Sequence, residues 1–183
     1  FIHIRRSAMG KAIGKIYPKK RASLFISLYE ENKDTILKMI NDNIKKTVIF
    51  SQFLSVVNYI CDDLNKNGIS TVKIVGGIQN RQDIISKFKH DDMVDVIIAT
   101  SQTLGVGVTL TEANQMFFFG TPWRSTDFDQ CCDRIHRIGQ THDVNIWNVK
   151  LNSDQLNLSD RLDKILNWSN QMFHSAIDEN TVS

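Results

Sequence analysis

Short apolar runs that alternate with amphipathic stretches are the feature that most limits how this chain can fold. Each run is rich in β-branched or aromatic residues and is apolar at consecutive positions, as in "VIIA" and "MFFF". This pattern is typical of strands covered on both faces, because a strand with one face in water alternates apolar and polar residues. The sequence predicts strands at residues 47–50, 70–75, 94–100, 115–120 and 144–149.

Between these strands the apolar residues recur at the spacing of an α-helix. Ile36, Leu37, Ile40 and Ile44 follow Asp34, which suits the first turn of a short helix. Further helices are predicted at residues 53–67, 84–88, 125–139 and 158–173. Because strand and helix alternate, we expect an α/β three-layer sandwich around a mostly parallel sheet.

The two ends of the chain differ from this alternating part. Seven of the first 21 residues are Lys or Arg, and no acidic residue occurs before Glu30. Residues 1–32 are therefore expected to be a basic extension or linker, which either touches an anionic surface or is simply solvated. The alternating domain is expected at 33–152 and a helical extension at 153–183.

Composition also bears on where the protein works. Three cysteines, two of them adjacent, do not form a disulfide framework and favour a reducing compartment. No signal peptide is recognisable, and no apolar run approaches the roughly 20 residues that a membrane-spanning helix needs. We therefore expect an intracellular protein with no membrane partner.

The segment "DQCCDRIHRIGQ", residues 129–140, holds the residues with the clearest chemistry. If the helix continues to Gly139, Gln130, Arg134 and Arg137 lie within about 60° of one another around its axis. A guanidinium group is costly to bury without an anion, and its planar fork suits phosphate oxygens. Phosphate is the favoured anion.

Two other interpretations apply to the same segment. A surface ion pair between Asp133 and Arg137, four residues apart, explains the pattern equally well on periodicity alone. Cys131, Cys132 and His136 suggest a metal, but one helix cannot gather the four tetrahedral ligands of a structural zinc. No metal site is predicted.

The ends of the strands indicate where a ligand would bind. In open α/β sheets ligands lie outside the carboxyl ends of the strands. The segments expected there are 51–53, 76–77, 100–107 and 120–123, which would form one rim. Arg81, next to the second of these, either faces a partner domain or is a charge on a helix surface.

Residues 129–140 resemble motif VI of the Swi/Snf-type ATPases of helicase superfamily two, whose pattern is a glutamine and then Arg-x-His-Arg-Ile-Gly-Gln. "VIFSQF" (48–53) is similar to motif IV, and "GGIQNRQDIISKF" (76–88) to the Gly and Arg-Gln element that follows it. "ATSQTLGVGVTLTEA" (99–113) is similar to motif V. The resemblance implies the second RecA-like lobe, the helicase C-terminal lobe, of a DNA-dependent ATPase.

The resemblance also implies roles for single residues. Arg134 and Arg137 would be arginine fingers that reach ATP held by another lobe, and Gln130 would help to position them or the nucleotide. The other candidates are Gly105 and Gly107, where the backbone could approach the nucleotide, and Thr100, Ser101, Thr109, Thr111 and Trp123, which could contact nucleic acid.

Some of the family's features are different or absent. Leu104 stands where motif V usually has the first of two adjacent glycines, and Arg124 follows Trp123 in place of the usual Asn-Pro. The sequence has neither a phosphate-binding loop nor an Asp-Glu box for Mg²⁺. ATP and its Mg²⁺ would therefore be held by an N-terminal RecA-like lobe of the same polypeptide, and the chain alone is expected to be inactive.

These observations predict the second motor lobe of a translocase on double-stranded DNA, which contacts phosphates and reads little sequence. Two alternatives stay open: a non-catalytic interaction module with a vestigial ATP site, and a lobe of an RNA helicase. The expected location is the cytoplasm of a bacterium or of an infected host cell, or the nucleus.

Overall fold

A computed structural model describes residues 21–103, 108–120 and 125–149 of the chain. In chain order the elements are α1 (Arg21–Glu31), α2 (Lys33–Asn41), β1 (Lys46–Ser51), α3 (Leu54–Lys66), β2 (Thr71–Ile74), α4 (Arg81–His90), β3 (Val96–Thr100), β4 (Ala113–Phe119), α5 (Ser125–Cys132) and β5 (Asn145–Val149). All five predicted strands are present within a residue or two of their expected positions. The helix predicted at 158–173 lies outside the described residues.

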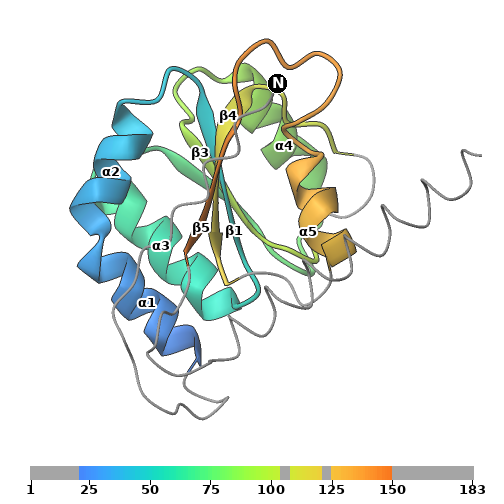
Figure 1. Cartoon of the computed structure of the whole chain (residues 1–183). Coiled ribbons are helices and arrows are strands. Elements are labelled where there is room, and N and C mark those ends of the chain that lie inside the picture. The colour runs from blue at the N-terminus through green and yellow to red at the C-terminus, as the bar shows by residue number, and fades with distance from the viewer. Residues whose placement is uncertain (1–20, 104–107, 121–124, 150–183) are drawn as a thin grey trace, which may run out of the picture.

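The strands form one sheet in the order β2-β3-β1-β4-β5, and every neighbouring pair is parallel. Helices α1, α2 and α3 cover one face and α4 and α5 cover the other (Figure 1). The three-layer α/β sandwich expected from the apolar runs is therefore confirmed. A parallel sheet needs helices on both faces because each of its crossover connections returns over the sheet.

Alternate residues of each central strand enter two separate cores, one on each face of the sheet. In β4, Phe117 and Phe119 pack under α1 and α3, whereas Met116 and Phe118 pack toward α4 and α5. All seven residues of β4 are buried. This explains the apolar run at residues 116–119, because neither face of the strand meets water.

Helix α1 was not predicted, since the sequence indicated an extension or linker up to residue 32. Phe25, Leu28 and Tyr29 of α1 are buried in the core on the α3 side of the sheet. The Tyr29 ring meets the Phe119 ring edge-on at 5.9 Å between centroids. The basic residues before this helix obscured its apolar face, which only the packing against α3 and β4 reveals.

A polar cluster joins α1 and α2 to α3 at the edge of this core. The Asp63 carboxylate accepts hydrogen bonds from the Tyr29 hydroxyl at 2.8 Å and from the Lys33 ammonium at 2.7 Å. Burial by itself raises the pKa of Asp63, but the hydrogen bonds from Lys33 and Tyr29 outweigh it and hold the pKa below its usual value. The charged form of Asp63 therefore ties three helices together.

Asp63 is expected to make stability depend on acid pH. A carboxyl whose pKa is lowered on folding stabilises the protein above its unfolded pKa of about 3.9, and this contribution is lost as the pH falls through the folded pKa. Urea denaturation between about pH 6 and pH 2 should therefore show a steeper loss in the wild type than in Asp63→Asn. Asp62→Asn, at an exposed neighbouring position, is the control and should follow the wild type. Parallel curves for the wild type and Asp63→Asn would contradict this role.

None of the helices in the described residues is long and apolar enough to cross a membrane.

Candidate functional site

Helix α5 is shorter than predicted. It ends at Cys132, although the sequence favoured a helix up to Gly139. The Ile135 amide bonds to the Cys132 carbonyl three residues back, so the last turn tightens. The Arg134 carbonyl then accepts a 2.7 Å bond from the Leu110 amide instead of continuing the helical ladder. The prediction that Gln130, Arg134 and Arg137 share one helical face was therefore wrong.

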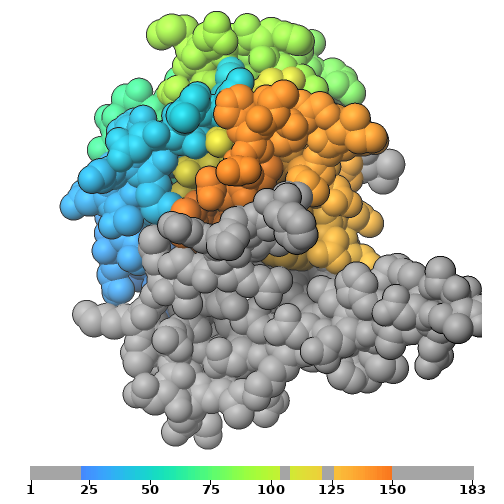
Figure 2. All heavy atoms as spheres, turned by 45° about the horizontal axis from the view of Figure 1, so that its top comes forward, coloured from blue at the N-terminus to red at the C-terminus, as the bar shows by residue number. Residues whose placement is uncertain are grey.

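Both arginines lie at the amino ends of the strands. Leu110, which binds the Arg134 carbonyl, also accepts a bond from the amide of Ala113, the first residue of β4. Helix α5 starts after the carboxyl end of β4 and runs back along the sheet. The turn that follows α5 therefore reaches the end of the sheet where the strands begin, its amino edge (Figure 1). Figure 2 turns this edge toward the viewer and shows the chain between α5 and β5, in orange, at the surface.

The Arg137 guanidinium is exposed and is held by a neutral partner. Its Nη1 donates to the Thr109 hydroxyl at 3.0 Å. Arg134 is half-buried, and its Nη1 makes a long contact of 3.5 Å with the Val108 carbonyl. Among the described residues the ion pairs join Lys33 to Asp63 and Lys89 to Glu112, so neither arginine is neutralised there. The alternative ion pair from Asp133 to Arg137 is not formed.

Gln140 fixes the turn that carries Arg137. Its side-chain nitrogen donates to the Ala113 carbonyl at 2.7 Å and to the Ile135 carbonyl at 3.0 Å. Its side-chain oxygen accepts from the amides of Thr141 and His142. Gly139 has φ +104°, which other residues rarely adopt, so this glycine allows the chain to reverse before Gln140. The sequence predicted this glycine as a helix end, whereas it serves a tertiary turn.

The predicted hydroxyl residues do not all lie at one end of the strands: two are at the carboxyl end and two at the amino end. Thr100 and Ser101 follow the carboxyl end of β3, where Thr100 Oγ1 lies 2.8 Å from Thr103 Oγ1. Thr109 and Thr111 precede β4 at the amino edge. The expectation that one rim holds the whole site is therefore wrong, because α5 carries motif VI across the sheet.

Three predicted residues lie outside the described part of the chain: Gly105, Gly107 and Trp123. Gln130 lies in α5 and is exposed. No contact between Gln130 and either arginine is found among the described residues, so a direct positioning role gains no support from this geometry.

Arg81 is the first residue of α4, beside the carboxyl ends of β2 and β3. Its Nε and Nη2 atoms are buried, and neither has a hydrogen-bond partner. Nearby Gly77 has φ +83°, and Thr103 packs close to Gly76. Buried guanidinium donors without partners are costly, so this rim favours an anion.

Cys131 is not available for chemistry. It is buried among the apolar residues on the α5 side of the sheet. Burial raises the pKa of its thiol to about 12, against a smaller opposing effect of the Arg134 charge. The thiol therefore stays protonated at neutral pH, and no cluster of three or more potential metal ligands occurs in the part of the chain that the structure describes.

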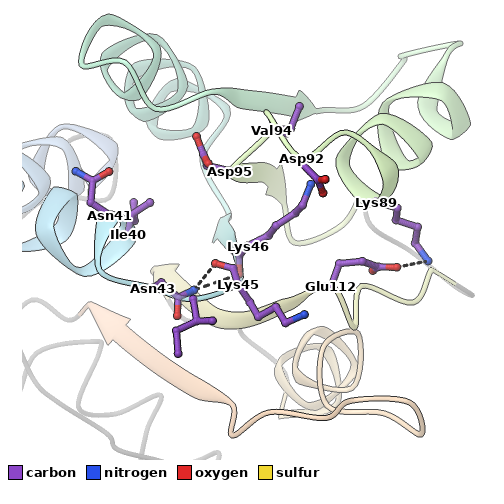
Figure 3. Close-up of a pocket in the computed structure, with 11 residues that line it drawn as sticks. Ile40, Asn41, Asn43, Lys45, Lys46, Lys89, Asp92, Val94, Asp95 and Glu112 are labelled. Atoms are coloured by element: carbon purple, nitrogen blue, oxygen red, sulfur yellow. Dashed lines mark hydrogen bonds and ion pairs between the residues drawn. The ribbon is translucent and has the colours of Figure 1, made fainter.

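A cavity of about 460 Å³ also opens at the amino edge, between the α2–β1 loop, the end of α4 and the start of β4 (Figure 3). The Lys46 ammonium donates to the Phe88 carbonyl at 2.7 Å and so caps the end of α4. Lys89 and Glu112 point toward each other, with 3.6 Å between charged atoms. None of the predicted site residues lines this cavity.

Arg137 presents an exposed guanidinium that has no carboxylate partner among the described residues. An exposed guanidinium without a carboxylate partner keeps its donors free for phosphate oxygens. The hydroxyl of Thr109 orients Arg137 without cancelling its charge. The planar fork of Arg137 can therefore bind an anion from outside the molecule.

The fold and the order of the motifs are those of a RecA-like helicase lobe. The chain belongs to the family of the helicase conserved C-terminal domain, which it matches over residues 31–139. Within that family it is a C-terminal lobe of the Swi/Snf type, as its relatives show.

Two curated relatives illustrate this similarity. The chain is 34% identical to helicase SWR1 of Saccharomyces cerevisiae over 114 residues, which cover 61% of this chain and 8% of that protein. It is 31% identical to a probable ATP-dependent helicase of Plasmodium falciparum over 147 residues, which cover 73% of this chain and 7% of that protein. The chain thus spans a small part of the curated relatives that it matches.

Solved structures agree on the fold. The C-terminal part of the Fun30 ATPase domain matches with a TM-score of 0.64 at 25% identity, covering 83% of this chain and 56% of that one. The SWI2/SNF2 ATPase core of Sulfolobus solfataricus in complex with dsDNA matches with a TM-score of 0.64 at 20% identity, covering 95% of this chain and 46% of that one. At that identity the second likeness speaks for the fold alone.

Proposed function

We propose that this lobe works as the second half of a DNA-dependent ATPase and translocase, and that Arg137 and Arg134 act as its arginine fingers. The observation that carries the proposal is the exposed Arg137 guanidinium, which is held by the Thr109 hydroxyl and not neutralised by any described carboxylate. A guanidinium supplied across an interface stabilises charge that grows on a transferred phosphoryl group.

The nucleotide itself would be held mainly by an N-terminal lobe of the same polypeptide. The sequence of this chain has no phosphate-binding loop and no Asp-Glu box, so the Mg²⁺ of bound ATP would belong to that first lobe. When bound, ATP supplies the phosphoryl group that is cleaved. The chain contributes the arginines, with Gln130, Gly105 and Gly107 as further nucleotide contacts implied by the motifs, and alone it would not hydrolyse ATP.

The geometry favours Arg137 over Arg134 as the principal finger. Arg137 is exposed and tied by a single side-chain bond, so it can turn toward a ligand at small cost. Arg134 is half-buried, and its carbonyl fixes the start of the turn through Leu110. Arg134 therefore has a structural task in addition to the charge that it offers.

Nucleic acid would lie at the other edge, along the carboxyl ends of β2 and β3. Thr100 and Ser101 lie there, and Arg81, whose Nε and Nη2 have no hydrogen-bond partner among the described residues, is at the start of α4, which follows β2. Hydroxyls, amides and guanidinium groups suit phosphate oxygens and read no bases.

Trp123 remains a proposed contact with nucleic acid. Thr109 is better assigned to holding Arg137, and Thr111, which shares its edge, becomes a weaker nucleic-acid candidate.

Double-stranded DNA is the favoured partner because the motif VI ending resembles the Swi/Snf type, and a structural neighbour of that type was solved with dsDNA. ATP would draw the two lobes together, and hydrolysis would let them part, so that the phosphate contacts of each lobe step in turn. The protein would then act where DNA is found, in the nucleus or the cytoplasm.

The choice of nucleic acid can be tested with the full-length protein. ATP hydrolysis is expected to rise at least about tenfold with duplex DNA and much less with single-stranded or duplex RNA, measured as phosphate release at saturating ligand. Duplexes of different base composition should stimulate equally. Stronger stimulation by RNA would favour the RNA helicase, and full binding of DNA with no hydrolysis would favour the interaction module.

A further inference from the structure

Ile138 follows Arg137 in the turn and is 100% exposed. A single exposed apolar residue is common on protein surfaces and by itself indicates nothing. What distinguishes Ile138 is the turn that carries it, which is fastened at both ends to the body of the lobe.

The contacts that fix this turn to the rest of the lobe lie within a few residues of Ile138 on either side. Before it, the Arg134 carbonyl accepts from the Leu110 amide at 2.7 Å, and Ile135 is completely buried. After it, the Gln140 side chain bonds to the Ala113 and Ile135 carbonyls. His136, Arg137, Ile138 and Gly139 therefore project as one short exposed run.

A turn of this kind fixes the backbone that carries these side chains before any partner arrives. Little backbone conformational entropy is then lost when a partner covers them, which is the advantage of a preorganised contact. The buried centres of protein interfaces are more apolar than their rims, and arginine is enriched among the residues that contribute most to binding. Arg137 and Ile138 place an arginine and an apolar residue side by side on this surface.

We propose that Ile138 is an apolar anchor that the first motor lobe covers when the nucleotide cleft closes. The proposal rests on the proposed function, since it takes the body that meets Arg137 to be that lobe. This chain covers 46% of a solved SWI2/SNF2 ATPase core, so such a core contains a further body of comparable size that could supply the covering surface. The apolar contact would set the distance at which the Arg137 fork meets the phosphate.

Cysteine protection tests this contact directly. In the full-length protein, the maleimide reaction of Ile138→Cys is followed by peptide mass spectrometry, which separates it from the buried Cys61 and Cys131 and from the half-buried Cys132. With duplex DNA and a non-hydrolysable ATP analogue, its rate should fall about tenfold, as for a closed state populated to about 90%. Ile44→Cys is the matched control, because Ile44 is 85% exposed at the same edge, and its rate should not change. Equal rates for Ile138→Cys with and without the analogue would overturn the proposal.

Kinetics give a second readout. Ile138→Ser should raise KM for ATP about fivefold while Ile138→Val keeps most of the wild-type value, since valine retains most of the apolar surface. If Arg137→Ala abolishes hydrolysis but Ile138→Cys is not protected, the proposed function stands and the anchor is wrong. If Arg137→Ala leaves hydrolysis unchanged and Ile138→Cys is not protected, the proposed function fails as well.

Discussion

Replacing Arg137 by alanine in the full-length protein is expected to lower DNA-stimulated ATP hydrolysis at least about tenfold, and up to about 10³-fold, with the fold intact. The guanidinium is exposed and rests on the Thr109 hydroxyl, so nothing in the core depends on it. Its removal should act mainly on kcat, because the charge that it stabilises grows as the phosphoryl group is transferred.

Two companion variants sharpen this experiment. Arg137→Lys keeps the charge but loses the planar fork, and should recover only a small part of the rate. Lys45→Ala, which removes an exposed cation elsewhere on the amino edge, should leave the rate within about twofold of the wild type. The three proteins should unfold at the same temperature. An unchanged kcat for Arg137→Ala would remove the arginine finger from the proposed mechanism.

Replacing Phe118 by alanine is expected to lower the free energy of unfolding by about 3–5 kcal/mol, the largest effect on stability that we predict. Phe118 is completely buried in β4, between β1 and β5. Its ring lies 5.5 Å from that of Phe50 and 4.7 Å from that of Phe128, measured between centroids. The cavity left by alanine cannot close, because a sheet on one side and α5 on the other fix its walls.

Urea denaturation of the chain, followed by circular dichroism, measures this loss. Phe118→Leu should cost clearly less than Phe118→Ala, since it fills more of the same space. Ile44→Ala, at a position that is 85% exposed, should change the free energy of unfolding by no more than about 0.5 kcal/mol. A loss below about 1 kcal/mol for Phe118→Ala would mean that this core is not packed as described. Because α5 precedes the turn with Arg137, the same substitution in the full-length protein should also weaken ATP hydrolysis.

Much of the fold could be predicted because the information is local. Residues 116–119 are apolar at consecutive positions, and a short run of this kind is typical of a strand covered on both sides. Helix α3 was equally clear, because its buried residues recur at helical spacing. Helix α1 was missed, since a basic segment precedes it and its apolar side is defined by Tyr29 meeting Phe119, a contact between distant residues.

The candidate site, like the fold, could be predicted only in part from the sequence. The sequence by itself determined the strands, the parallel sheet and the identity of the motif that carries Arg134 and Arg137, because residue type and short-range spacing suffice for these. Only the tertiary structure decided that α5 ends at Cys132 and that both arginines lie at the amino edge, away from Thr100. The reason is the competition for one backbone carbonyl: the amide of Leu110, 24 positions earlier in the chain, takes the bond that a longer helix would have used.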